Sequence, residues 1–322
     1  MNAPAILFLA PLLALVGPLA AFEVVESDAR LEIRDRDKTV FGWQRGPIEE
    51  PKGGEKFAAS AFIHPLTTPS GFGLTNIQPS DHLHHFGVWW PWKHLEIGGK
   101  KYNCWELQAG EGRQMAAAAE IMRKSSDEVV VRTLNHHEIR DGENYRPVLR
   151  EETTLTFTRL EDDAYQLDIG ITQTPAEGVD VLVSAYRYSG FSWRGPAVWT
   201  GENSRMLSSG GHDRTNANHQ PASWVMVGGP TPSGKATMLV LSAAPVGGGE
   251  AERLRVWGPD QHHGEPFVNF NPVVGKSLPL TEPAVAHRKY RLLMADREIT
   301  PGEADKLWKA WETELAPPDR KP

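Results

Sequence analysis

Alternation of apolar and polar side chains is the feature that most constrains the fold of this chain. Residues 149–158 read LREETTLTFT, so odd-numbered side chains share one face of an extended strand and even-numbered side chains share the other. The next run places Tyr165, Leu167, Ile169 and Ile171 on one apolar face. The intervening turn at 161–163 predicts that the two runs pair as a β-hairpin.

Similar short runs recur along the chain, separated by Gly, Pro, Asn and Asp, which is the punctuation of β-sheet proteins. The further predicted strands are 28–34, 38–44, 57–63, 128–139, 179–188, 236–243, 252–257 and 285–294. Helical periodicity is convincing only near the C-terminus, where Thr300 fits an N-cap, Pro301 the first helical position and Glu303 a capping box. We therefore predict an all-β fold of packed antiparallel sheets, with a short C-terminal helix outside them.

The N-terminus predicts export. Residues 1–21 form an apolar run that ends in small residues, as a secretory signal peptide does, and an uncleaved membrane anchor is the alternative. We expect 22–322 to form a single β-sandwich domain in the periplasm or outside the cell, without membrane contact beyond the signal. No internal repeat or persuasive linker divides this part of the chain.

Charge and cysteine content exclude several classes of function. The formal net charge is −7 and the acidic residues are spread along the chain, so nothing favours nucleic acid as a partner. Cys104 is the only cysteine, which excludes an intrachain disulfide and multi-cysteine metal sites. Its expected role is a small buried hydrophobic residue beside Trp105.

The most unusual segment is DHLHHFGVWWPW, residues 81–92. If 81–85 is extended, His82 and His84 point to one side, with Asp81 and His85 on the other. A cupin-type metal site would need a glutamate where Val88 and Trp89 stand. Two other interpretations stay open: a metal held with help from His262, His263 or Glu265, and histidines that only hydrogen-bond loop backbone under a tryptophan lid.

The favoured interpretation is general acid/base chemistry on a carbohydrate, because histidine titrates near neutrality and aromatic rings offer flat faces to sugars. The candidate catalytic residues are Asp81, His82, His84, His85, Glu106 and Glu265. The candidate substrate-binding residues are Trp89, Trp90, Trp92, Trp105, Arg194, His212, Arg214 and His263, several of them in the glycine-rich stretch 188–234. No cofactor is expected, with a metal on His82 and His84 as the alternative. A non-catalytic glycan-binding module is the rival function.

The same segment resembles a family of unknown function that carries the label PmoA, or methane oxygenase. The resemblance rests on HPLTTPSG at 64–71, on DHLHHFGVWW, on YSGFSWRG at 188–195 and on the closing YRLLMADREITPGEADKLWKAW. It covers essentially the whole chain after the signal. Family members commonly have arginine where this chain has Phe86, so an anion-binding role at that position is not expected here.

The family label itself does not suit the sequence. A particulate methane monooxygenase subunit has several long apolar helices, and this sequence has no comparable run after residue 21. Methane oxidation is therefore not expected. The resemblance instead implies a galactose mutarotase-like supersandwich, a fold used by sugar epimerases, polysaccharide lyases and glycoside hydrolases. A hydrolase, a lyase and an epimerase all remain open.

Overall fold

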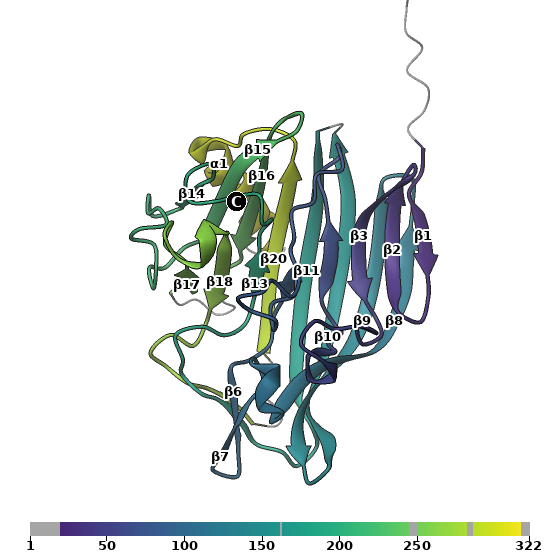
Figure 1. Ribbon diagram of the computed structural model, residues 1–322, viewed down its shortest axis with the longest axis vertical. Helices are drawn as coiled ribbons and strands as arrows, with labels where there is room; N and C mark the ends of the chain where they lie inside the picture. The colour runs from purple at the N-terminus through teal and green to yellow at the C-terminus, as the bar shows by residue number, and fades with distance from the viewer. Residues whose placement is uncertain (1–19, 162, 245–249, 282–285, 317–322) are drawn as a thin grey trace, which may run out of the picture.

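The computed structural model describes residues 20–161, 163–244, 250–281 and 286–316. The predicted signal segment 1–21 lies outside this part except for its last two residues. Three antiparallel sheets and one helix make up the fold, so the predicted all-β class is confirmed (Figure 1). Within the described residues, no helix has the length and apolar character needed to cross a membrane.

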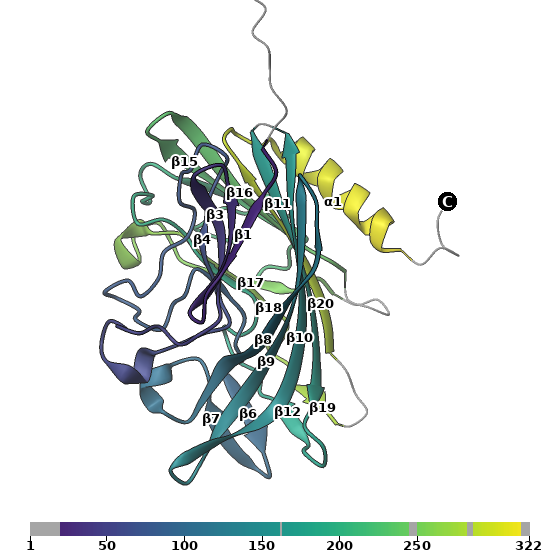
Figure 2. The same ribbon diagram turned by 90° about the vertical axis from the view of Figure 1, so that its right-hand side faces the viewer.

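Two eight-stranded sheets face each other and a smaller third sheet lies at one end (Figure 2). Sheet 1 has the order β1 (Glu23–Glu26), β2 (Arg30–Asp35), β3 (Lys38–Gln44), β4 (Ile63–Leu66), β5 (Val88–Trp89), β13 (Ser192–Arg194), β18 (Phe267–Asn271) and β17 (Arg253–Val256). Sheet 2 has the order β14 (Arg205–Ser208), β15 (Trp224–Thr231), β16 (Gly234–Ser242), β20 (Ala286–Ala295), β11 (Ala164–Pro175), β10 (Asn144–Glu161), β9 (Glu128–Asp141) and β8 (Gly112–Lys124). Sheet 3 has the order β19 (Leu278–Leu280), β12 (Val181–Val183), β6 (His94–Ile97) and β7 (Lys100–Asn103).

The alternating pattern predicts most strands correctly. The predicted hairpin is β10 with β11, in which Leu155 pairs with Ile169. The predicted strand at 57–63 is wrong, because 55–57 form the 3-10 helix η1 (Glu55–Phe57) and Ala61 has a left-handed φ of 59°. Phe57 and Phe62 are buried by loop packing in this stretch and not by strand alternation. Only 181–183 of the predicted strand 179–188 is extended in a sheet.

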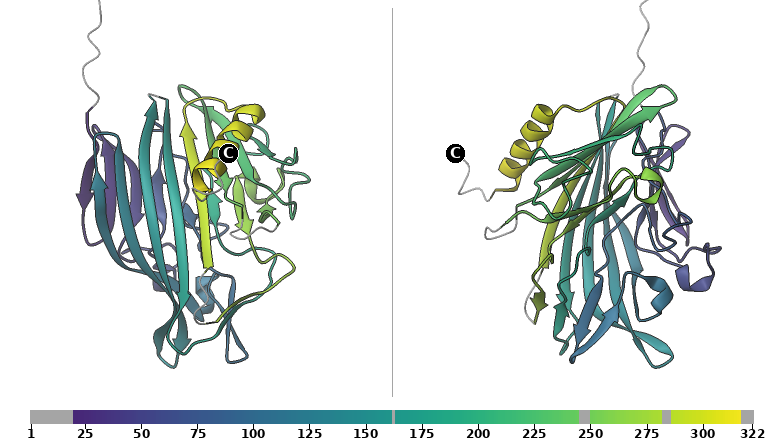
Figure 3. Two further views of the ribbon diagram at one scale, coloured as in Figure 1. Left: turned by 180° about the vertical axis from the view of Figure 1, so that it is seen from behind. Right: turned by 60° about the vertical axis from the view of Figure 1, so that its left-hand side comes forward.

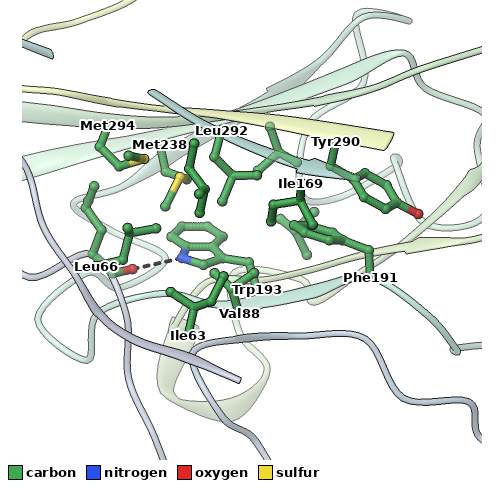
Figure 4. Close-up of a cluster of buried hydrophobic side chains, with 14 of the residues drawn as sticks. Ile63, Leu66, Val88, Ile169, Phe191, Trp193, Met238, Tyr290, Leu292 and Met294 are labelled. Carbon is green, nitrogen blue, oxygen red and sulfur yellow. Dashed lines mark hydrogen bonds between the residues drawn. The ribbon is translucent and has the colours of Figure 1, made fainter. Parts of the chain in front are cut away.

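The core lies between sheets 1 and 2. Figure 4 shows Trp193 of β13 surrounded by Ile63 and Val88 of its own sheet and by Met238, Leu292 and other side chains of sheet 2. Trp193 is fully buried, and its Nε1 donates to the carbonyl oxygen of Leu74 at 2.8 Å. Since side chains alternate along a strand, the neighbouring Arg194 points to the opposite face of sheet 1.

The helix α1 (Pro301–Leu315) packs on the outer face of sheet 2, as the sequence predicts (Figures 2 and 3). Thr300 is its N-cap and accepts a hydrogen bond from the backbone N–H of Glu303 at 3.2 Å. Trp311 is buried against the sheet. The indole of Trp224 in β15 donates to Asp305 at 2.8 Å, which fixes the helix to the strand below it.

A charged residue is fully buried on the inner face of sheet 2. The carboxylate of Glu151 in β10 lies 2.9 Å from the imidazole Nε2 of His137, and neither side chain is exposed. It also accepts hydrogen bonds from five further side chains, those of Trp90, Gln114, Asn135, Thr153 and Gln173. Burial raises the pKa of Glu151, but these partners outweigh burial and lower it. The network ties the segment that follows β5 to sheet 2.

Replacing this carboxylate should destabilise the fold strongly. Glu151→Ala leaves several buried donors without an acceptor, so the free energy of unfolding should fall by about 3–5 kcal/mol. The matched control is Glu152→Ala, since Glu152 is the next residue of β10 and its side chain is exposed. That change should lower the free energy of unfolding by less than about 0.5 kcal/mol. Chemical denaturation of the two variants measures the difference, and equal stability would contradict a structural role for Glu151.

Candidate functional site

The histidine segment is a compact turn on the outer face of sheet 1, between β4 and β5. The N–H of His85 donates to the carbonyl of His82 at 3.0 Å, and the N–H of Gln78 donates to the carbonyl of His85 at 2.8 Å. The extended geometry considered for 81–85 is therefore not the one adopted. The turn brings the rings of His82, His84 and His85 together, with ring centroids 4.6–5.4 Å apart.

Gly87 allows this turn to end at the edge of β4. Its φ is 61°, a conformation that side chains other than glycine rarely adopt. A Cβ atom at Gly87 would lie 2.3 Å from the carbonyl oxygen of Ile63, so no other residue fits. The chain then enters β5 with Val88 directed into the core and Trp89 directed toward the histidines.

The four candidate tryptophans pack in different places. Trp89 and Trp105 pack beneath the histidines, with the Trp89 ring 4.9 Å from that of His85. Trp90 and Trp92 lie in the interior, where their indoles donate to Glu151 and Gln173. The prediction that Trp90 and Trp92 bind substrate beside the histidines is therefore wrong. All four rings are at most 3% exposed, so none presents a free face to a sugar.

A buried guanidinium connects two carboxylates of the site. Arg194 in β13 is fully buried and donates from Nη2 to Asp81 Oδ1 at 3.1 Å and to Glu265 Oε2 at 2.5 Å. Asp81 also lies 3.0 Å from Nδ1 of His82 and 3.3 Å from Nδ1 of His262. Burial raises the pKa of Asp81, while Arg194 and His82 lower it and prevail. Arg194 thus holds Asp81 and Glu265 and is not free for a substrate.

Glu106 is held at a second position near His84. It accepts hydrogen bonds from Tyr188 at 2.6 Å and Asn103 at 3.1 Å, and its Oε1 lies 2.8 Å from the buried Lys93 ammonium. Burial raises the pKa of Glu106, but these three donors lower it to about 2. Glu106 is therefore ionised near neutral pH, and its side chain remains 31% exposed.

Two of the histidines are held neutral by their surroundings. Burial and the nearby His82 lower the pKa of His84 to about 4, although Glu106 opposes them. Burial lowers the pKa of His85 well below its usual value. His85 is stacked against Trp257 and Phe267, and its buried Nδ1 has no hydrogen-bond partner. His84 is half-buried and reaches the open surface, whereas His85 forms part of the floor.

The remaining predicted binding residues have other roles. Arg214 is buried and donates to the backbone oxygens of Trp257 at 3.2 Å, Gly264 at 2.7 Å and Glu265 at 3.2 Å. It braces the loop that carries His262. His212 lies in the turn after β14, and no contact among the described residues joins it to the histidine cluster. His263 is exposed, and its neighbour His262 is the residue that meets Asp81.

Several residues of the site are not apparent from the sequence. Trp257 follows β17, and its ring lies 3.9 Å from that of His262 and 5.5 Å from that of His85. Lys93 and Tyr188 hold Glu106. Phe86 stacks on Phe62 with centroids 5.1 Å apart, so its position is filled by packing. Cys104 is buried beside Trp105, as expected, and burial raises the pKa of its thiol to about 12.

The cluster has an open face but little internal space. A small cavity of about 20 Å³ lies beside His84, lined by Phe86, Trp89 and Trp105 among others. This volume suits about one water molecule and not a sugar ring. The open face of the cluster is formed by the partly exposed side chains of Asp81, His82, His84, Glu106 and His262.

The shared guanidinium should control the order of both loops of the site. Arg194→Lys keeps the charge but loses the planar guanidinium that binds two carboxylates. We therefore expect the free energy of unfolding to fall by about 1–3 kcal/mol. Amide hydrogen exchange should become faster in 76–87 and 257–266. Arg187→Lys, at an exposed position close by in sequence, is the control. Unchanged exchange in both segments of Arg194→Lys would show that the ion pairs do not hold the loops.

Comparisons with known proteins give a family and little else. No curated protein matches the sequence significantly. Similar solved structures include heparan sulfate lyase HepC from Pedobacter heparinus and a mutant of it, with TM-scores of 0.38 and identities of 9% and 10%. They cover 87% and 88% of this chain, which spans only 36% of theirs, and a TM-score this low does not indicate a shared fold. The family of unknown function DUF6807 matches residues 30–309, and the chain belongs to this family.

Proposed function

We propose that this protein is an exported enzyme that acts on a carbohydrate, with His84 as the acid/base group and Glu106 as its complementary carboxylate. The observation that carries the proposal is the convergence of an accessible imidazole and an accessible carboxylate on one open face of sheet 1. The segments that supply them, 76–87 and 103–106, are separate in sequence and are fixed independently by hydrogen bonds. A scaffold that positions both groups rigidly suits acid/base catalysis.

The aromatic surface for a sugar is supplied by tyrosines in this proposal. Tyr186 and Tyr188 are partly exposed, with ring centroids 4.8 Å apart, and the hydroxyl of Tyr188 donates to Glu106. Their rings are the partly exposed aromatic surface adjacent to the carboxylate. A pyranose packed there would lie beside Glu106, with the buried tryptophans supporting the floor below it.

The ionisation of Glu106 and the pairing of Asp81 favour some reactions over others. Hydrolysis by two carboxylates needs one of them protonated as a general acid. Glu106 is held ionised by Lys93 and Tyr188, and Asp81 is occupied by Arg194. We therefore favour a reaction in which a proton is removed from a sugar carbon and returned or lost, as in an epimerase or a lyase. Neutral His84 would accept the proton from the sugar carbon and return or release it, and ionised Glu106 would accept a hydrogen bond from a sugar hydroxyl.

The sequence resemblance also supports an enzyme that acts on carbohydrate. We take the chain to be related to the PmoA-labelled proteins and to have a galactose mutarotase-like supersandwich, an arrangement used by epimerases, lyases and hydrolases of sugars. Its apolar N-terminal segment 1–21 would direct the domain to the periplasm or the medium, where glycans are encountered.

The test is a screen of oligosaccharides, including oxidised keto-sugars, with products identified by mass spectrometry. On a substrate that the protein converts, His84→Asn and Glu106→Gln should each lower kcat by about 100-fold or more. His136→Asn is the matched control, because His136 lies on the outer face of sheet 2. It should retain full activity.

Two results would overturn the proposal. The first is a glycan that binds equally well to the protein and to both variants and is never converted, which would indicate a binding module. The second is full turnover by His84→Asn and Glu106→Gln, which would place the reaction elsewhere.

A further inference from the structure

Three potential metal ligands converge beside the proposed reaction site. Oδ2 of Asp81 lies 3.0 Å from Nδ1 of His82 and 3.3 Å from Nδ1 of His262, and each of the three residues offers one ligand atom within 4.8 Å of those of the other two. Two of these residues come from the turn after β4, and the third comes from η3 (His262–Gly264), about 180 positions later. We infer that Asp81, His82 and His262 form a binding site for a divalent transition-metal ion such as Zn²⁺.

The spacing suits ligands that share one ion. Zn²⁺ binds histidine nitrogen and carboxylate oxygen at about 2.0–2.2 Å, which places neighbouring ligand atoms about 3.0–3.5 Å apart. Both measured separations fall in this range. The Nδ1 of His82 is buried, and the carboxylate of Asp81 is the acidic group beside it. A shared ion would coordinate both atoms.

Asp81 supplies the anionic ligand of the site. Its Oδ2 faces both imidazoles, while Asp81 and Glu265 share the guanidinium of Arg194. A bound divalent ion would take this carboxylate and the two imidazole nitrogens as its ligands.

The site is held in place before any ion binds. Arg194 fixes Asp81 from the sheet, and Arg214 braces the loop of His262 through three backbone oxygens. His262 itself has a left-handed φ of 50°, a strained conformation that the surrounding contacts must maintain. Trp257 packs against the His262 ring on one side, while His262 keeps 35% of its side chain exposed on the other. An ion there would retain open positions toward solvent or substrate.

A neighbouring group, His82, His84 and His85, also has its ligand atoms within 4.8 Å of one another. It offers three imidazoles and no negative charge. We assign the ion to the group that contains Asp81, because the carboxylate supplies charge and the position is more accessible. This choice leaves His84 free for the reaction proposed above, and the metal site stands whether or not that reaction is correct.

The experiment measures metal binding directly on the full chain without a histidine tag. Protein made metal-free with a chelator and then dialysed is titrated with Zn²⁺ by calorimetry, and bound metal is counted by elemental analysis. We expect about one equivalent. His262→Ala should weaken binding by at least about 100-fold, because even partners outside the coordination shell are worth about 10–100-fold.

The matched control is His263→Ala, which removes the adjacent, exposed histidine and should bind as the unaltered protein does. Asp81→Asn is a second test variant that keeps the shape of the side chain. Circular dichroism of the metal-free proteins checks that each variant is folded, and Co²⁺ absorption reports the number of ligands. The inference is supported if His262→Ala and Asp81→Asn lose binding while His263→Ala retains it.

Three results would overturn it: no stoichiometric binding by the unaltered protein, equal effects of His262→Ala and His263→Ala, or binding lost only in His85→Ala. The last would place the ion on the three-histidine group. Because the readout is binding, failure of the sugar screen leaves a positive metal result intact. Turnover by a protein that binds no metal would refute only the metal site.

Discussion

The ion pairs of Arg194 are the interaction on which the site depends. Trp193 anchors β13 in the core, so the next side chain must emerge on the opposite face of sheet 1, where it is buried by two loops. A buried guanidinium requires partners, and Asp81 and Glu265 supply them from segments far apart in the sequence. Because an unpaired buried charge would be costly, these ion pairs hold both loops in position, and with them His82 and His262.

The buried Glu151 performs a related task on the other side of sheet 1. Trp90 and Trp92 follow directly after β5 and donate to Glu151 and Gln173 of sheet 2. The segment between the histidine turn and sheet 3 is therefore fastened to the far sheet. The aromatic run WWPW thus serves mainly to connect the two sheets, and only Trp89 supports the histidines.

The sequence predicts the repetitive parts of this fold and misses what depends on distant contacts. Period-two alternation locates β9, β10 and β11 because each buries one face along most of its length. The same rule fails at 57–63, where Phe57 and Phe62 are buried by loops. Alternation also gives no sign of the turn at 81–85, where the backbone N–H of Gln78 donates to the carbonyl of His85.

The candidate site is also only partly predictable from the sequence, because some of its residues act through distant contacts. Asp81, His84 and Glu106 are recognisable by residue type and by their nearness in sequence to aromatic residues. His262 and Lys93 acquire their roles only through tertiary contacts with Asp81 and Glu106. The adjacent pair of His262 and His263 illustrates the limit, since the two share a residue type and a loop. The carboxylate of Asp81 meets only His262, although both residues have a left-handed backbone, and no spacing rule predicts this difference.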